Sequence, residues 1–176
     1  MKRARRQIGF VSTRLAGTDG VSLEAAKWAS ILTELGYESS CFAGESDWPK
    51  ERSYLVPEAH FAHPDILALN ADIFDNETRS STTSGRIQTL RYRLKEHLYE
   101  FIRTFGVNLL IVENALSLPM NIPLGLALTE LVAETGMPVV AHHHDFSWER
   151  KRFAVNAAAD YLRAAFPRSF LRSITW

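Results

Sequence analysis

Residues 7–36 constrain the fold more than any other stretch, because they read as a strand, a glycine-containing loop and a helix in succession. The apolar run 8–11 is followed by a polar segment, 13–20, that contains Gly17 and Gly20. The apolar residues that recur at helical spacing after this loop are Val21, Ala25, Trp28, Ile31, Leu32 and Leu35. Gly36 is expected to end this helix. The loop therefore leaves the carboxyl end of a strand, where open α/β sheets bind ligands.

Similar patterns alternate through the rest of the chain. Strands are predicted at residues 38–43, 53–57, 109–112 and 137–141, and helices at 86–105, 123–134 and 154–165. Residues 60–70 carry a weaker helical pattern that Pro64 interrupts, and the polar residues 72–85 are predicted to form a mobile loop. This alternation favours an α/β fold with a parallel sheet of roughly five or six strands and helices on both faces.

Composition limits the function classes. The 176 residues suit one domain with a sizeable core, and the 20 basic and 20 acidic side chains cancel, which removes the overall charge that favours nucleic-acid binding. Cys41 is the single cysteine and is expected to be buried and inert. Without a signal peptide or a membrane-spanning apolar run, a cytoplasmic protein is expected. A peripheral membrane association through loops would leave no trace of this kind.

The last residues, 173–176, read as the beginning of an apolar strand. A strand in that position would leave an unpaired edge, so we expect residues 1–176 to be one lobe of a longer protein. An isolated lobe would expose the face that meets its partner lobe, and self-association through the C-terminal segment is then expected. The aromatic candidates for this exposed surface are Tyr161, Phe166, Phe170 and Trp176.

Three loops follow predicted strands and are expected to meet at one edge of the sheet. In the first, Gly17 and Gly20 flank Asp19 and would let the backbone approach a ligand closely, while the following helix offers free N–H groups to an anion. The alternative is a tight turn that needs positive φ. Neither the third glycine of a dinucleotide-binding fingerprint nor the Gly-Lys-Ser/Thr of a P-loop is present.

The second loop was assigned to residues 113–117, directly after a buried strand. Glu113 and Asn114 can bracket sugar hydroxyls, because a carboxylate and an amide both offer paired hydrogen-bonding atoms. Equally, Asn114 can be a turn residue and Glu113 a solvated acid.

The third loop follows residues 137–141 and begins with three consecutive histidines. Side chains alternate along a strand, so His142 and His144 would share one face while His143 points away. Together with Asp145, the two histidines can be metal ligands or polar contacts to a ligand. The histidines can also have a purely structural role. No further cluster supplies the remaining ligands, so the sequence assigns no metal site. Arg150, just beyond, can steady a phosphate or be solvated.

Two motifs in these loops resemble the family-4 retaining glycosyltransferases. Val11-Ser12-Thr13 with Gly17-Thr18-Asp19-Gly20-Val21-Ser22 is similar to the first strand, loop and helix of that family. Pro138-Val139-Val140-Ala141-His142-His143-His144-Asp145-Phe146 is similar to its strand that ends in a His-Asp pair. The motifs have the right order and separation, and the resemblance covers nearly the whole chain. It implies a Rossmann-like domain, residues 1–176, that is the N-terminal, acceptor-binding lobe of the two-domain GT-B arrangement.

The resemblance also implies roles for individual residues. Gly17 and Gly20 would border the donor phosphates, and Asp19 would meet acceptor or sugar hydroxyls. His144 would be the catalytic residue, hydrogen-bonded to the transferred sugar near its reacting carbon, and Arg150 would help with charge. The partners implied are a nucleotide-sugar donor, a sugar or small-molecule acceptor, and a C-terminal domain that binds the donor. No metal or other cofactor is implied, and the chain alone is expected to be inactive.

Three other functions compete with the transferase. A self-standing α/β module could bind a sugar or a partner without catalysis. A metal hydrolase could be built around His142 and His144. Two-lobed sugar-nucleotide epimerases share the fold, but their carboxylate and histidine sets are not evident here.

Overall fold

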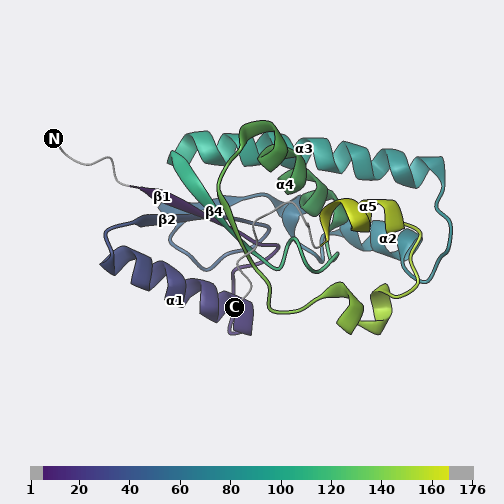
Figure 1. The fold of residues 1–176 in the computed structure, drawn as a ribbon, viewed down its shortest axis with the longest axis horizontal. Helices are drawn as coiled ribbons and strands as arrows, with labels where there is room; N and C mark the ends of the chain where they lie inside the picture. The colour runs from purple at the N-terminus through teal and green to yellow at the C-terminus, as the bar shows by residue number, and fades with distance from the viewer. Residues whose placement is uncertain (1–5, 167–176) are drawn as a thin grey trace.

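The computed structural model describes residues 6–166, and within them five parallel strands form one sheet in the order β3-β2-β1-β4-β5. The strands are β1 (Gln7–Val11), β2 (Glu38–Ala43), β3 (Ser53–Leu55), β4 (Val107–Glu113) and β5 (Val139–His142). The helices are α1 (Gly20–Glu34), α2 (Pro64–Ile73), α3 (Ser81–Phe105), α4 (Ile122–Thr135) and α5 (Ala159–Ala165). Short 3-10 turns lie at Lys50–Arg52, Pro57–Ala59, Ser147–Glu149 and Lys151–Phe153. The predicted Rossmann-like α/β fold is confirmed (Figure 1).

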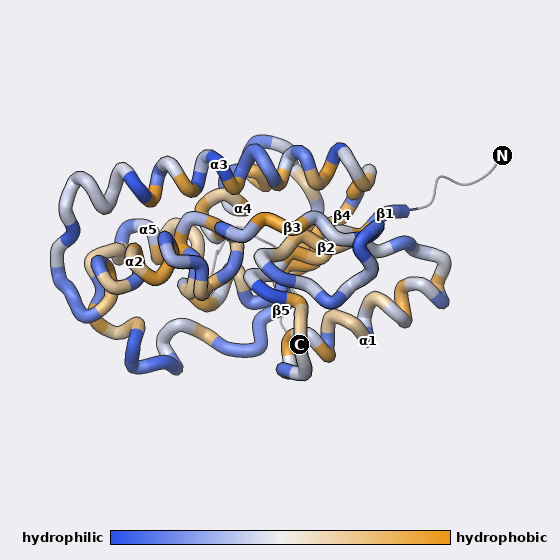
Figure 2. The backbone as a smooth tube through the Cα atoms, turned by 180° about the vertical axis from the view of Figure 1, so that it is seen from behind, coloured by the Kyte–Doolittle hydropathy of each residue, from blue (hydrophilic) through white to orange (hydrophobic). Residues whose placement is uncertain are grey.

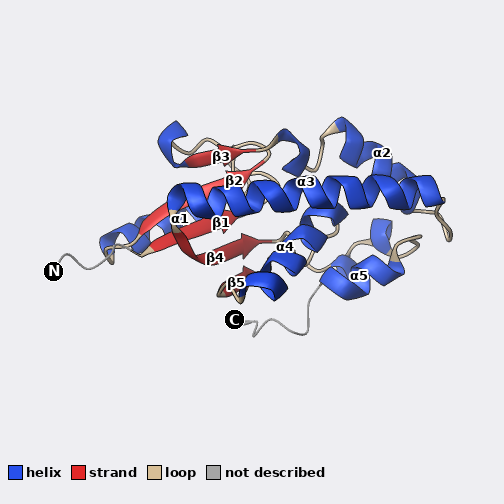
Figure 3. Cartoon of the chain, turned by 90° about the horizontal axis from the view of Figure 1, so that it is seen from above, coloured by secondary structure: helices blue, strands red, loops and turns tan. Residues whose placement is uncertain are grey.

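Helices cover both faces of the sheet. Helix α1 lies against one face, and α3 and α4 lie side by side on the other (Figure 1). Helices α2 and α5 lie beyond the carboxyl ends of the strands, next to the first half of α3 (Figure 3). The carboxyl edge of the sheet is therefore bordered by α1 on one side and by this small helical group on the other.

The sheet is the most apolar part of the chain, because central parallel strands are buried on both faces (Figure 2). The second half of α3 packs on the sheet through Leu94, Leu98 and Phe101, whereas Ile87 and Leu90 in its first half pack against α2, α4 and α5. Gly9 of β1 lets the Phe101 ring approach closely, since a Cβ at this position would lie 2.7 Å from the ring. Cys41 is fully buried, and burial raises the pKa of its thiol, which agrees with an inert side chain.

Half of the polar stretch 72–85 is helical, and the predicted loop is confined to its middle. Helix α2 begins at Pro64, because a proline fits the first turn of a helix, and continues through Ile73. Helix α3 begins at Ser81, where the Ser80 hydroxyl caps it by accepting from the Thr83 N–H. The connection is therefore only residues 74–80. The sequence analysis predicted a loop from the serines and threonines among residues 80–84. In the structure Ser80 caps α3, and residues 81–84 form its first turn.

The helix predicted at 154–165 is also shorter than expected. Residues 155–157 bond to the end of α2 instead: the Asp75 N–H donates to the Val155 carbonyl and the Ala157 N–H donates to the Ile73 carbonyl. These bonds remove the backbone groups that a longer helix would need, so α5 begins at Ala159.

Helix α1 rests on the sheet through small side chains. Ser22, Ala25 and Ala29 are its buried residues, whereas Ile31 and Leu35 are 56% and 68% exposed. Trp28 and Leu32 are partly buried against the same core, so the apolar stripe predicted from the sequence overlaps the packing face only in part.

The prediction of exposed C-terminal aromatic residues was wrong for Phe166, which is 6% exposed and packs against Gly125 of α4. Tyr161 is half-buried, and its hydroxyl accepts a hydrogen bond from Gln88. Phe170, Trp176 and the strand predicted at 173–176 lie outside the described residues. Among residues 6–166, no helix combines the length and the apolar character needed to cross a membrane.

Arg79 ties the loop before α3 to the start of α5. Its guanidinium donates to both carboxylate oxygens of Asp160, at 2.7 and 2.6 Å, and to the Ala157 carbonyl at 2.6 Å. It also lies over the Tyr161 ring, 4.4 Å from the centroid. Hydrogen bonds from Arg79 lower the pKa of Asp160. This bidentate pair holds two segments that are distant in sequence.

We expect Asp160→Asn to destabilise the fold in a pH-dependent way. A carboxyl whose pKa is lowered by folding stabilises the native state above its unfolded pKa of about 3.9, and this contribution is lost as the pH falls through the lower folded value. The variant should be less stable than the wild type by up to about 1 kcal/mol at pH 7, because the carboxylate is partly exposed. Urea unfolding at pH 7 and at pH 3 measures the difference, with the exposed Glu77→Gln as control. A difference that stays constant below pH 4 would contradict this role.

Candidate functional site

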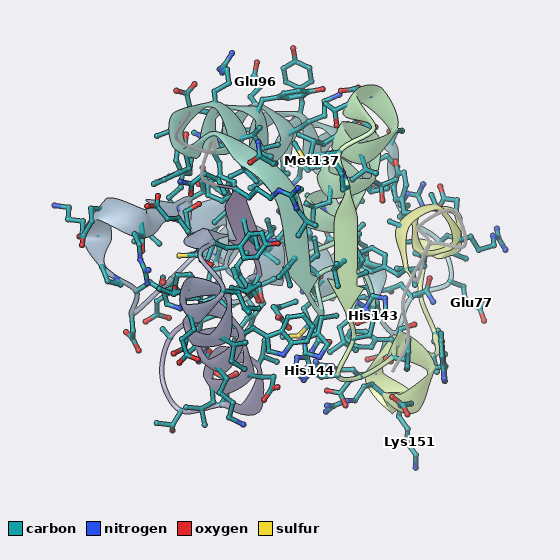
Figure 4. The ribbon with its side chains drawn as sticks, turned by 60° about the vertical axis from the view of Figure 1, so that its left-hand side comes forward. Glu77, Glu96, Met137, His143, His144 and Lys151 are labelled. Atoms are coloured by element: carbon teal, nitrogen blue, oxygen red, sulfur yellow. The ribbon has the colours of Figure 1, made fainter. Side chains whose placement is uncertain are left out.

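The three loops predicted to meet do leave the same edge of the sheet. In the parallel register, Val11 of β1 lies beside Val112 of β4, and Glu113 of β4 lies beside His142 of β5. The Ser12 hydroxyl donates to the Glu113 carbonyl at 3.4 Å, which joins the first loop to the second. Figure 4 shows His143 and His144 at the end of β5, between α1 and the 3-10 turns near Lys151.

Glu113 is the centre of this edge. It is the last residue of β4 rather than part of the following loop, and its side chain is 0% exposed. Its Oε2 atom lies 3.0 Å from His142 Nδ1 and 2.9 Å from His144 Nε2. The predicted alternative of a solvated acid was therefore wrong, because strand register carries the carboxylate between two imidazoles.

The histidines alternate as the strand geometry requires. The rings of His142 and His144 lie on the same side with centroids 4.3 Å apart, and both reach Glu113. His142 also stacks on Trp28 of α1, at 4.8 Å between centroids. His143 points elsewhere and meets the Phe146 ring edge to face. Burial, and then the nearby charges of His142 and His144, lower the pKa of His143.

Asn114 holds the turn that follows Glu113. Its backbone adopts positive φ, +56°, a conformation that asparagine tolerates better than most residues. Its N–H donates to the His142 carbonyl at 3.0 Å, and its side-chain Oδ1 accepts from the His144 N–H at 2.7 Å. The predicted turn role is confirmed, and the same side chain also positions the backbone of His144.

The first loop combines a helix cap with an ion pair. Asp19 is the N-cap of α1: it accepts from the Ser22 N–H at 3.1 Å and pairs with Arg14 at 2.7 Å. Burial raises the pKa of its carboxyl, but the hydrogen bonds from Ser22 and Arg14 outweigh this, so the net shift is downward. Gly17 has φ +80°, and its N–H donates to Asp47 at 2.6 Å. Gly20 is exposed in the first turn of α1.

The third loop carries a second ion pair and an aromatic pair. Arg150 donates to Asp145 at 2.7 Å, so these two predicted site residues bind one another. Phe146 and Trp148 stack with their rings nearly parallel, 4.5 Å between centroids, and Trp148 is 67% exposed. An exposed aromatic face beside paired charges is suited to contact with a sugar ring.

Sequence reasoning missed Trp28, Arg14 and Trp148 as members of this edge. Trp28 was counted only as part of a helical stripe, and its contact with His142 depends on how α1 lies across the sheet. For Arg14 a signal was available, since an arginine in a glycine loop five residues before an aspartate can pair with it. The Phe146-x-Trp148 pattern beside the His-Asp pair was likewise readable as an aromatic surface.

The site can bind ligands in two ways. The paired Arg14–Asp19 and Arg150–Asp145 offer both donors and acceptors to hydroxyl or anionic groups. Glu113, His142 and His144 form a group whose potential ligand atoms all lie within 4.8 Å of one another, which makes them candidate metal ligands.

The structure predicts that Asn114→Ala lowers the free energy of unfolding more than Asn114→Gly does. Asn114→Ala removes the acceptor for His144 and places alanine at positive φ, so the free energy of unfolding should fall by about 2 kcal/mol. Asn114→Gly removes the acceptor but adopts positive φ freely, so the loss should be about 1 kcal/mol. Urea unfolding measures both, and amide hydrogen exchange at His144 should accelerate in each variant. Equal losses in the two variants would show that backbone strain is not involved.

Comparison with known proteins gives a distant relationship. No protein-family model matches the chain, and no solved structure matches it significantly. The chain is 28% identical over 166 residues to the mannosylglucosylglycerate synthase of Petrotoga mobilis, covering 93% of this chain and 37% of that protein. It is 32% identical over 148 residues to the mannosylglucosylglycerate synthase of Thermotoga maritima, covering 82% of this chain and 33% of that protein. The chain thus spans about a third of the length of these curated relatives, and it is related to part of a glycosyltransferase.

Proposed function

We propose that this chain is the acceptor-binding lobe of a retaining glycosyltransferase, which moves a sugar from a nucleotide-sugar donor to a sugar or small-molecule acceptor. The observation that carries the proposal is the similarity to two mannosylglucosylglycerate synthases, which in one case covers 93% of the chain and so includes all three carboxyl-edge loops. The convergence of these loops on the Glu113–His142–His144 cluster supports it. A C-terminal domain that binds the donor completes the proposed enzyme.

The first loop would face the donor. Gly17 and Gly20 are exposed and carry no side chain, so a diphosphate can approach their backbone closely. Asp19 keeps its carboxylate 34% exposed while it caps α1, so it can still accept hydrogen bonds from sugar hydroxyls. Arg14 beside it supplies a cation at the same place.

His144 would contact the transferred sugar. Its Nε2 is engaged by Glu113 at 2.9 Å, which fixes the ring, so Nδ1 would be the atom that meets the sugar. In the retaining reaction that the resemblance implies, the acceptor attacks the face from which the diphosphate leaves. A hydrogen bond from His144 near the reacting carbon would then orient the sugar for this attack.

The second and third loops would hold the acceptor. The relatives' name describes a product with mannosyl, glucosyl and glycerate units, so an acceptor of that class would present hydroxyls and one carboxylate. Asn114 and Asp145 would bind hydroxyls, and Trp148 would stack on a sugar ring. Arg150 can release Asp145 and bind a ligand carboxylate instead, because the carboxylates of Asp145 and of the ligand have the same planar geometry.

The chemical step needs more cationic groups than this lobe supplies. Negative charge develops on the leaving diphosphate, and preorganised cations stabilise it. In the proposal these groups come from the C-terminal domain.

The binding roles can be tested on the 176-residue chain by amide NMR during titration with glucosylglycerate and, separately, with nucleoside diphosphate sugars. Shifts are expected at Gly17, Gly20, Asn114 and His144, and not along α3. Arg150→Ala should raise the Kd for glucosylglycerate about tenfold, which is about 1.4 kcal/mol. Arg103→Ala, which removes an ion-paired surface arginine of α3, is the control and should bind as the wild type does.

A turnover assay distinguishes the two-lobe enzyme from a chain that is active by itself. The 176-residue chain should form no product from any sugar nucleotide, and measurable transfer would refute the two-lobe assignment. Shifts confined to residues outside the three loops would refute the acceptor-binding role.

A further inference from the structure

We propose that Glu113, His142 and His144 form a binding site for one divalent first-row transition metal ion. This inference goes beyond the transferase and does not rest on it, because it concerns three side chains whose geometry is independent of any sugar ligand. It also departs from the metal-free chemistry that the family resemblance implies.

The three potential ligand atoms already converge. Glu113 Oε2 lies 3.0 Å from His142 Nδ1 and 2.9 Å from His144 Nε2, and all three atoms lie within 4.8 Å of one another. Metal bonds of about 2.0–2.2 Å at tetrahedral angles hold neighbouring ligand atoms roughly 3.3–3.5 Å apart. Small side-chain movements would therefore convert the cluster into a coordination shell.

Charge favours a cation at this point. The Glu113 side chain is fully buried, and a buried carboxylate is costly unless a positive group compensates it. A divalent ion compensates the carboxylate while both imidazoles stay neutral, which is the form that binds metal.

The surrounding structure holds all three ligands in place. The His142 ring stacks on Trp28, and its carbonyl accepts from the Asn114 N–H at 3.0 Å. The His144 N–H donates to the Asn114 side chain at 2.7 Å. Glu113 is fixed by β4 between two neighbouring strands. Outer contacts of this kind orient metal ligands before an ion arrives.

The donor set indicates which ion and which further ligand fit. Two imidazole nitrogens with one carboxylate suit Zn²⁺, Co²⁺ or Ni²⁺ better than Mg²⁺ or Ca²⁺, which prefer oxygen ligands. Three protein ligands leave a coordination position for water or for a substrate oxygen. The side chains of His142 and His144 are 22% and 24% exposed, so this position can open toward the carboxyl edge, where hydroxyl or carboxylate groups would enter.

Calorimetry with Zn²⁺ and visible absorption with Co²⁺ test the site on the 176-residue chain after treatment with a chelator. One ion per chain is expected, with Co²⁺ bands that mark coordination by fewer than six ligands. Glu113→Gln, His142→Ala and His144→Ala should each raise the Kd at least about tenfold. His143→Ala is the matched control from the same tripeptide, and His97→Ala removes a histidine of α3; both should bind as the wild type does.

The outcomes are distinct. If neither ion binds, or if His143→Ala or His97→Ala abolishes binding instead, the site does not exist and the cluster is only a hydrogen-bonded group. Circular dichroism checks the fold of each variant. If Glu113→Gln does not fold, the two partly exposed histidine variants decide the question. Loss of transferase function in a longer chain would leave this result unaffected, since the readout is the bound ion.

Discussion

The parallel register between β4 and β5 is the constraint on which the site depends. It places Glu113 beside His142, and the alternation of side chains along the chain then brings His144 to the same carboxylate. Because Glu113 is buried at the end of a central strand, its carboxylate must be compensated by neighbours within the protein. A shift of one residue in this register would turn the side chain to the other face of the sheet and separate it from both imidazoles.

Helix α1 connects the first loop to this cluster. Asp19 caps the start of the helix, and about two and a half turns later Trp28 stacks on His142. Asp19, which the proposed function places next to a sugar, is thus also the residue that caps the helix, so replacing it is expected to shift Trp28 as well.

The charges at the carboxyl edge are already paired. Arg14 binds Asp19 and Arg150 binds Asp145, so an anionic ligand would have to displace an acid at either place. Such exchange favours ligands with a well-placed planar anion over those with charge alone. A metal ion held by the Glu113 cluster would replace the hydrogen bond between His144 and Glu113 in fixing the imidazole ring, so the transferase and metal proposals use the same edge of the sheet.

Local patterns in the sequence were enough to predict the alternating strands and helices and the parallel sheet, because hydrophobic period and backbone conformation act over a few residues. They also placed His142 and His144 on one face. They misjudged residues 72–85 and 154–158, where a cap and bonds to α2 decide the backbone, and the packing face of α1. Only the tertiary structure decided that Glu113 lies between the histidines, since residues 113 and 142 meet through strand pairing and no local pattern encodes the register of two strands separated by a helix.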